Sequence, residues 1–248
     1  MSRKKLIHFE EMKKWPNVFE PTFSHAAGGG FKLDDGPQGK KGKWGELCAC
    51  AQGGGVVLEL GCGKGDYTLG LAEMKPSAVV VGVDIKGARL WAGAHAALEK
   101  GLSNAFFLRA KIESLPEFFA DGEVDEIWIT FPTPHPAGRN EKRRLTSPRF
   151  LEIYRKLLKP CAFNGKGGAL HLKTDSRNFY LYSLEIARAA GFKIVDSTDD
   201  LYGICARAQA EDPARAIQTT YEKKYLAEGR KICYMRSELR SELLIESG

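Results

Sequence analysis

The sequence predicts an α/β fold with a mostly parallel sheet and helices on both faces. From Gly54 onward, short β-rich apolar runs alternate with helix-length amphipathic stretches, which is typical of βαβ units. The runs are nearly continuous in apolar residues, as expected for strands that are buried on both faces. A glycine-rich turn at residues 61–65 stands between the first of these runs and the helix that follows. This arrangement favours a Rossmann-like sheet that binds its ligand outside the carboxyl ends of the strands.

The expected elements follow the chain in order. Strands are predicted at residues 55–60, 77–85, 105–110, 124–131, 167–175, 192–198 and 231–236. Amphipathic helices are predicted at Lys86–Gly101, Pro148–Lys159 and Ser176–Gly191. The opening through Gly45 has several prolines, the run Gly28–Gly30 and little periodicity, so it is predicted to be an extended arm with one short helix near Phe9–Lys14. The expected domains are therefore a basic arm at residues 1–45 and an α/β domain at residues 46–248.

Composition and charge limit the function classes. The 248 residues, of which 43% are hydrophobic, can bury a sizeable core, so the sequence predicts a soluble globular protein and not a disordered one. No window approaches the roughly 18 apolar residues of a membrane span, and the start lacks a signal-peptide pattern, so the cytoplasm is expected. Of the net charge of +6, +4 lies in the first 45 residues, where nine Lys and Arg stand against five Asp and Glu.

A second basic cluster contains Arg139, Lys142, Arg143 and Arg144. Such patches are required for binding a polyanion, although a solvated basic face is an equally common reason for a charge run. The six cysteines are scattered, and the only close pair, Cys48 and Cys50, lacks a second pair or a histidine cluster. Reduced thiols and no metal site are therefore expected.

The glycine-rich turn and two acidic residues predict a nucleoside pocket. Gly61, Gly63 and Gly65 allow the backbone to turn tightly and to approach a ligand. A dinucleotide fingerprint places its third glycine one position later, and an acid at Glu59 would repel a pyrophosphate, which weakens the nicotinamide alternative. Asp84 ends the next strand, where an acid binds ribose hydroxyls. S-adenosylmethionine fits this pocket because it combines adenosine with a sulfonium and an ammonium group. A tight turn with no ligand remains the alternative.

The segment after the fourth of these strands reads ITFPTPHPAGRNEKRRLTSPRFL. Pro132, Pro134 and Pro136 restrict φ and disfavour a helix, so this segment is predicted to be a stiff rim beside the ligand. A rigid rim next to a basic stretch suits a flipped-out base with its phosphates held nearby.

The chain resembles the tRNA (guanine-N(7)-)-methyltransferases of the TrmB type. The resemblance rests on ELGCGKG, FPTPHPAGRNEKRRLTSPRFL, LHLKTD and TTYEKKYLAEGRKI, and on FEEMKKWPNVFEPTF in the arm. It implies a class I S-adenosylmethionine-dependent methyltransferase fold with a sheet of about seven strands. It also implies transfer of a methyl group to guanine N7 in the variable loop of tRNA, by a monomer or a homodimer without a metal or a membrane.

The resemblance assigns roles to residues at matching positions. The implied donor-binding residues are Glu59, Gly61, Gly63, Asp84, Ala110, Lys111 and Thr133. The implied substrate-binding residues are Ala137, Arg139, Arg143, Asp175, Thr219, Thr220, Tyr221 and Glu222, with Lys142 and Arg144 beside them on the tRNA backbone. Plainer roles stay open, because Asp175 could cap the helix that begins near Ser176 and Glu222 could pair with Arg230 or a lysine.

The sequence departs from the family at one chemically important position. Thr133 stands where the family usually has Asp, His135 where it has Trp, and Asn140 replaces a usual His. Guanine N7 carries a lone pair and no proton, so a general base is not obligatory and Thr133 as the implied catalytic residue is expected to suffice. Two alternatives remain, a donor-binding but inactive RNA-binding module and a methyltransferase for another RNA target.

Overall fold

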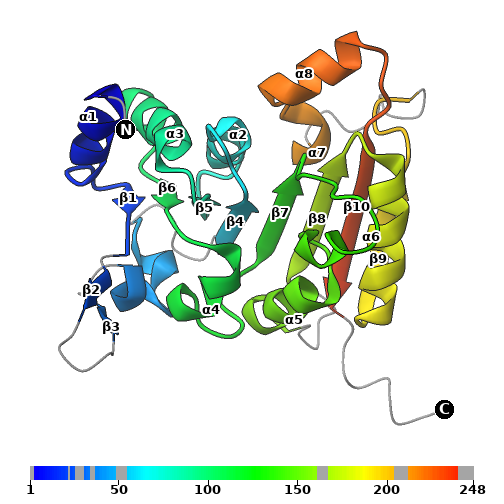
Figure 1. Cartoon of the computed structure of the whole chain (residues 1–248), viewed down its shortest axis with the longest axis horizontal. Helices are drawn as coiled ribbons and strands as arrows, with labels where there is room; N and C mark the ends of the chain where they lie inside the picture. The colour runs from blue at the N-terminus through cyan, green and yellow to red at the C-terminus, as the bar shows by residue number, and fades with distance from the viewer. Residues whose placement is uncertain are drawn as a thin grey trace. The chain divides into compact units, whose positions relative to one another are not determined.

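The computed structural model describes residues 3–21, 23–25, 31–33, 37–48, 55–160, 167–203 and 212–239 (Figure 1). The chain divides into two compact units, Met1–Ala120 and Asp121–Gly248. They are called unit 1 and unit 2 below. Each unit contributes four strands to the α/β fold, in the order β1-β6-β5-β4 in unit 1 and β7-β8-β10-β9 in unit 2.

Unit 1 is a parallel sheet with crossover helices. Its strands are β1 (Val18–Phe19), β4 (Val56–Leu60), β5 (Val79–Val83) and β6 (Ala105–Leu108). Every residue of β4, β5 and β6 is buried, which explains why the sequence shows continuous apolar runs here. Helices α2 (Asp66–Met74), α3 (Gly87–Glu99) and α4 (Leu115–Phe118) connect or follow these strands. The parallel register therefore brings the carboxyl ends of three strands to one edge.

The N-terminal segment packs against the other elements of unit 1. Helix α1 (Arg3–Met12) contacts α3, and it begins earlier than the helix expected near Phe9–Lys14. Strand β1 extends the sheet beside β6, and the Asn17 side chain donates to the Ala94 carbonyl at 3.0 Å. The indole of Trp44 is fully buried and donates to the Phe118 carbonyl at 2.8 Å. The segment thus supplies core side chains and a strand, which its low periodicity did not indicate.

Shorter elements complete this segment. Strands β2 (Phe23–His25) and β3 (Phe31–Leu33) pair antiparallel, and two 3-10 turns follow at η1 (Pro37–Lys40) and η2 (Trp44–Glu46). The Gly28–Gly30 run lies outside the described residues. A domain boundary at residue 45 remains a prediction.

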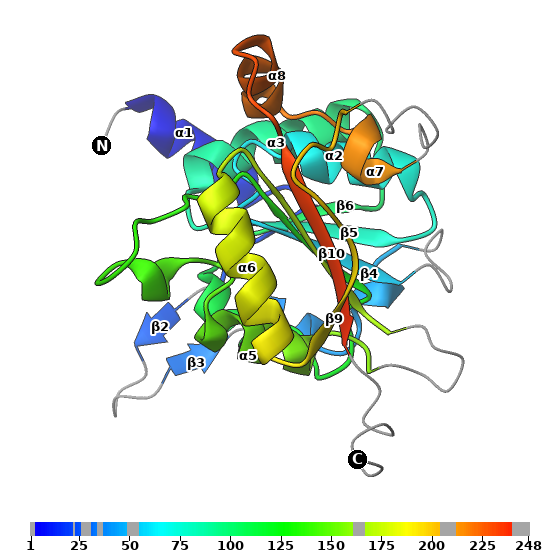
Figure 2. The same cartoon turned by 90° about the vertical axis from the view of Figure 1, so that its right-hand side faces the viewer.

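Unit 2 combines parallel and antiparallel strands. Its strands are β7 (Glu126–Thr130), β8 (Ala169–Thr174), β9 (Phe192–Thr198) and β10 (Cys233–Leu239). Strand β7 runs parallel to β8, whereas β10 lies antiparallel between β8 and β9. Helices α5 (Pro148–Leu157) and α6 (Arg177–Ala189) precede and follow β8, and α7 (Pro213–Ala216) and α8 (Thr220–Ala227) precede β10. Figure 2 shows α6 (yellow) lying along one face of these strands.

An aromatic stack fills the core of unit 2. The Trp128 ring of β7 stacks on His171 of β8, with ring centroids 3.8 Å apart. His171 Nδ1 lies 2.9 Å from the hydroxyl oxygen of Tyr234 in β10, and burial raises the pKa of that hydroxyl above its usual range. Three neighbouring strands are thereby locked together on one face of the sheet.

The α/β fold class is confirmed, with eight strands in place of about seven. All seven strands expected from the sequence are present, and the additional one is the two-residue β1. Cys62 and Cys233 are free and buried, as expected, but Cys48 is disulfide-bonded, so the expectation of reduced thiols is wrong for Cys48. Within the described part of the chain, no helix has the length and apolar character to cross a membrane.

Candidate active site

The glycine-rich turn after β4 forms an open backbone surface in unit 1. Gly61 and Gly63 both have positive φ, at 75° and 59°. The Gly61 and Cys62 amides donate to the Val83 carbonyl at 2.8 and 3.1 Å, which ties the turn to β5. A Cβ added at Gly61 would meet no heavy atom within 4 Å, whereas one at Gly65 would lie 2.8 Å from the Phe107 ring. The first glycine thus leaves room for a ligand, and the third permits close packing of the helix.

Two carboxylates flank this turn at the ends of neighbouring strands. Glu59, in β4, is buried and accepts a hydrogen bond from the Thr68 hydroxyl. Asp84, directly after β5, accepts from the Gly63 amide at 3.0 Å and from the Lys86 amide at 2.8 Å. Both acids are therefore oriented by hydrogen bonds within the protein, and backbone donors hold Asp84 at the edge of the turn.

The electrostatics of the turn favour a cation. Burial raises the pKa of the Cys62 thiol well above its usual value, and the negative charges of Glu59 and Asp84 raise it further. The thiol therefore stays protonated and neutral, and the two carboxylates supply the charge. A sulfonium or ammonium group suits this potential, whereas a pyrophosphate does not.

Ala110 and Lys111 lie just past β6, at the same edge of unit 1 as Glu59 and Asp84. Ala110 is buried and Lys111 is exposed. The Asp84 amide donates to the Leu108 carbonyl at 3.3 Å, which links the ends of β5 and β6. The residues of unit 1 that the sequence predicts to bind the donor therefore lie at one edge of its strands.

In unit 2, a strained rim follows β7. Phe131 and His135 have φ values of 47° and 35°, which side chains other than glycine rarely adopt. Each such conformation costs about 1–3 kcal/mol and persists only where neighbouring contacts impose it. One such contact is the hydrogen bond from the Phe131 amide to the Lys173 carbonyl, at 2.9 Å. Thr133 and Ala137 are exposed along this rim.

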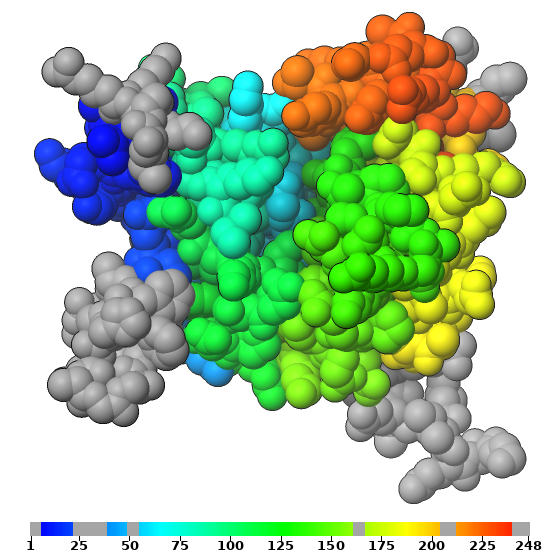
Figure 3. Space-filling model, viewed as in Figure 1, coloured from blue at the N-terminus to red at the C-terminus, as the bar shows by residue number. Residues whose placement is uncertain are grey.

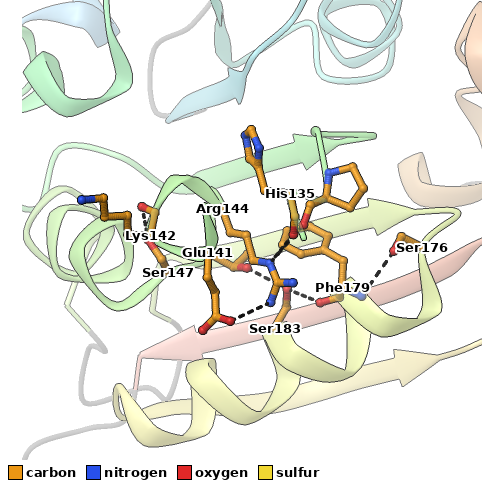
Figure 4. Close-up of polar contacts among 10 residues, drawn as sticks. His135, Glu141, Lys142, Arg144, Ser147, Ser176, Phe179 and Ser183 are labelled. Carbon is orange, nitrogen blue, oxygen red and sulfur yellow. Dashed lines mark hydrogen bonds and ion pairs between the residues drawn. The ribbon is translucent and has the colours of Figure 1, made fainter. Parts of the chain in front are cut away.

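The basic cluster divides into exposed and buried members. Arg139, Lys142 and Arg143 are exposed, as a surface for phosphates requires. Arg144, which the sequence groups with these cations on the tRNA backbone, is only 8% exposed. Its Nε donates to the carbonyls of Pro134 and His135 at 3.0 and 2.9 Å (Figure 4). Burial lowers the pKa of His135, and the positive charges of Arg143 and Arg144 lower it further, so its ring is neutral near pH 7.

Asp175 lies just past the end of β8. Its carboxylate accepts a hydrogen bond from the Arg230 guanidinium at 2.9 Å. The N-cap of α6 is Ser176, whose hydroxyl accepts from the Phe179 amide. Asp175 is therefore not the cap, and its half-buried carboxylate stands at the strand end with one cationic partner.

The residues at the start of α8 fall into two groups. Thr219 and Glu222 form a capping box, in which each side chain accepts from the other residue's amide. Glu222 is fully buried, and its carboxylate also pairs with Lys173 and accepts from the Tyr202 hydroxyl at 2.7 Å. Thr220 and Tyr221 point outward, and Tyr221 is 62% exposed. Figure 3 shows α8 (orange) at the surface of unit 2.

Lys173 and Tyr202, which the sequence analysis did not single out, contact the carboxylate of the candidate site residue Glu222. The Lys173 ammonium is fully buried in β8, lies 2.8 Å from Glu222 Oε1 and donates to the Ile217 carbonyl at 3.0 Å. Burial lowers the pKa of Lys173, although the Glu222 carboxylate opposes that shift. A lysine inside the buried run LHLKTD was the signal that could have revealed this pair.

Comparisons with known proteins identify the family. A family described as "Putative methyltransferase" matches residues 54–235. The chain is 40% identical over 239 residues to the tRNA (guanine-N(7)-)-methyltransferase of Christiangramia forsetii, covering 96% of this chain and 99% of that protein. The chain belongs to the tRNA (guanine-N(7)-)-methyltransferase family. The enzyme of that name from Porphyromonas gingivalis is 41% identical over 226 residues, or 90% of this chain and 85% of that protein.

Solved structures agree on the fold. The 16S rRNA methyltransferase KamB superposes with a TM-score of 0.54 at 19% identity, over 75% of this chain and 87% of its own. A 30S ribosomal A1408 methyltransferase from an uncultured bacterium gives 0.54 at 16% identity, over 85% and 97%. These similarities confirm the class I methyltransferase fold. Membership of the tRNA (guanine-N(7)-)-methyltransferase family confirms S-adenosylmethionine as the cofactor. Among the residues that the structure describes, no group of three or more His, Cys, Asp or Glu could hold a metal ion.

Proposed function

We propose that the protein transfers a methyl group from S-adenosylmethionine to guanine N7 in the variable loop of tRNA. The observation that carries this proposal is the identity of about 40% with tRNA (guanine-N(7)-)-methyltransferases along nearly the whole chain. The geometry of the glycine-rich turn supports the donor, and the exposed cations after β7 support the nucleic acid. The cytoplasm, as the place of the tRNA substrate, and a monomeric or homodimeric state remain predictions.

The residues of unit 1 fit the donor. The open side of Gly61 leaves space for the methionine part, Glu59 balances the positive charge, and Asp84 retains lone pairs for the ribose hydroxyls. Ala110 and Lys111 offer backbone groups to the adenine. When bound, S-adenosylmethionine supplies a methyl group on a sulfonium, which is already a good leaving group.

The chemistry at the acceptor requires orientation more than proton transfer. Guanine N7 carries a lone pair and no proton, so no base has to remove one before the new bond forms. Thr133, exposed on the stiff rim, can hold the base by a hydrogen bond without carrying charge. Holding two reactants in a near-attack geometry can by itself supply about 7–11 kcal/mol of the barrier reduction.

Different residues of unit 2 bind the phosphates and the guanine of the tRNA. Arg139 and Arg143 contact phosphates, and Ala137 lies beside them on the rim. The guanine is held by Asp175 together with exposed groups at the start of α8, namely Thr220 and Tyr221. Thr219 and Glu222 are buried and position these groups, because the capping box and the ion pair of Glu222 with Lys173 fix the first turn of α8.

A direct assay tests this proposal. Labelled methyl groups are transferred from S-adenosylmethionine to an unmodified tRNA transcript, and the modified nucleoside is identified after digestion. Recovery of 7-methylguanosine from the variable loop is the expected result. A different methylated nucleoside would overturn the assignment of the atom, and label at another position would overturn the assignment of the loop.

A second candidate is a donor-binding but inactive RNA-binding module. The observation that favours it is Thr133 at the position where the family usually has a carboxylate. In that case calorimetry would show binding of S-adenosylmethionine and of tRNA, while the methyl-transfer assay would yield no labelled nucleoside.

A further inference from the structure

We propose that Arg144 is a positioning residue that holds the rim segment Phe131–Ala137 in its catalytic shape, and that it does not bind tRNA. This inference rests on the proposed function, in which that rim presents Thr133 to the guanine. It separates Arg144 from the neighbouring cations with which the sequence groups it. Four features of its surroundings carry the argument.

The first feature is the pair of carbonyls that Arg144 binds. One N–H, on Nε, is shared between the carbonyl oxygens of Pro134 and His135, at 3.0 and 2.9 Å. A proline ring cannot donate a hydrogen bond, so the segment Pro132–Pro136 has few ways to be held by its own amides. The buried Arg144 guanidinium, which binds two successive carbonyls, replaces the hydrogen bonds that the proline residues cannot donate.

The second feature is the burial and stacking of the guanidinium. Arg144 is 8% exposed, and its Cζ lies 4.2 Å from the centroid of the Tyr182 ring in α6. Its NH1 lies 3.8 Å from the Glu141 carboxylate. The guanidinium is therefore packed on an aromatic face and paired with a carboxylate, which leaves it unsuited to approach a phosphate.

The third feature is the rigid base from which Arg144 extends. Two residues that follow Arg144 are held by hydrogen bonds. The hydroxyls of Thr146 and of Ser183 in α6 lie 2.7 Å apart, and the Ser147 hydroxyl donates to the Lys142 carbonyl at 3.2 Å (Figure 4). Thr146 and Ser183 are both fully buried. Arg144 thus connects the body of α6 to the rim.

The fourth feature is the strained backbone at and near the carbonyls that Arg144 binds. His135, whose carbonyl is bound, has a φ of 35°, and Phe131 at the other end has 47°. Residues of these types relax from such conformations unless neighbouring contacts hold them. Loss of Arg144 is therefore expected to loosen the rim and to move Thr133 away from its position.

The test compares Arg144→Met with Arg143→Met, an exposed neighbour that the proposed function assigns to phosphate. For Arg144→Met we expect kcat to fall by about three- to tenfold, no more than in Thr133→Ala, and the tRNA Kd to stay within about twofold of the wild type with an unchanged salt dependence. For Arg143→Met we expect weaker tRNA binding and a slope of log K against log salt that is smaller by about 1. Arg155→Met, on the exposed side of α5, is the matched control and leaves both quantities unchanged.

Hydrogen exchange gives a readout that does not depend on activity. Pro132, Pro134 and Pro136 carry no amide hydrogen, and the Phe131 amide of the rim donates to the Lys173 carbonyl. The Phe131 amide should exchange at least about tenfold faster in Arg144→Met than in the wild type, whereas amides of β7 and β8 should not change. Arg144→Lys, which keeps a donor but cannot stack flat on Tyr182, should give intermediate values of kcat and exchange. This milder variant also serves if Arg144→Met does not fold.

Two results would overturn the inference. One is a wild-type kcat together with wild-type exchange of the Phe131 amide in folded Arg144→Met. The other is a loss of tRNA affinity and of salt dependence in that variant equal to the loss in Arg143→Met. Absence of methyl transfer by the wild-type protein would refute the proposed function instead, and the exchange rates would still test the clamp.

Discussion

Substitutions of Thr133 test whether methyl transfer in this protein needs a general base. The proposed reaction removes no proton before the N7–methyl bond forms, so Thr133→Ala should lower kcat by no more than about tenfold, the value of one lost hydrogen bond. Thr133→Asp should leave activity within about tenfold of the wild type. The measurement is kcat from pH 6 to pH 9 for all three proteins, with buffer ionic strength held constant.

The outcome that contradicts this account is a loss of about a thousandfold or more in Thr133→Ala, because a hydrogen bond that only positions a base does not contribute so much. A pH dependence present in Thr133→Asp and absent from the wild type would show that the aspartate has introduced a titrating group. It would leave the mechanism of the threonine enzyme unchanged.

Glu59 is predicted to act through its charge. Glu59→Gln keeps an oxygen that can accept from Thr68 but removes the negative charge beside the turn, so the Kd of S-adenosylmethionine should rise about tenfold. Calorimetry measures this directly. Glu73→Gln, an exposed substitution on α2, is the control and should not change the Kd. An unchanged Kd in a folded Glu59→Gln protein would show that the donor is placed wrongly.

At the scale of elements, helix α8 depends on a buried ion pair. Lys173→Met should destabilise the protein by about 3–5 kcal/mol, because Glu222 would remain charged and buried without its partner. Urea unfolding gives this value. Adding Glu222→Gln should recover part of the loss, since the amide needs no counter-ion and its oxygen can still accept from the Thr219 amide. Strict additivity of the two single effects would contradict the coupling.

The N-terminal segment is predicted to be part of the folded core of unit 1. Trp44 is fully buried, donates to the Phe118 carbonyl and packs on the Phe119 ring, with centroids 4.8 Å apart. Trp44→Ala should therefore cost about 3–5 kcal/mol of stability, measured by urea unfolding. Lys43→Ala, next to it and exposed, should have little effect. A negligible loss in Trp44→Ala would instead support an arm that is independent of the core.

Sequence patterns predicted the longer strands better than the short strand β1 or the contacts of a single side chain. The seven apolar runs all became strands. In β4, β5, β6 and β8 the reason is burial on both faces, which requires nearly every residue to be apolar, whereas most residues of β9 are not buried. The two-residue β1 carries no such pattern, and the Trp44 contacts depend on residues far along the chain. The fold could be read from periodicity, but the packing of the N-terminal segment could not.

For the molecule as a whole, the sequence predicted the part of the candidate site that depends on a tight turn and on strand ends. The glycines and the acids of the donor turn follow from strand ends and turn geometry, so their residue types alone pointed to them. The cations after β7 were different, because four basic residues within six positions look alike in sequence. Tertiary contacts decide which of them face solvent, and only the structure shows Arg144 turned inward.

Methylation at guanine N7 can be tested by a substitution of one atom in the tRNA. A tRNA with a single 7-deazaguanine at the variable-loop guanine has a C–H group where the lone pair should be, and it keeps the other base-pairing groups. With labelled S-adenosylmethionine we expect no methyl transfer to this tRNA, normal transfer to the unmodified transcript, and similar binding of both. Equal methylation of the two tRNAs would contradict the account, because the acceptor would then be a different atom.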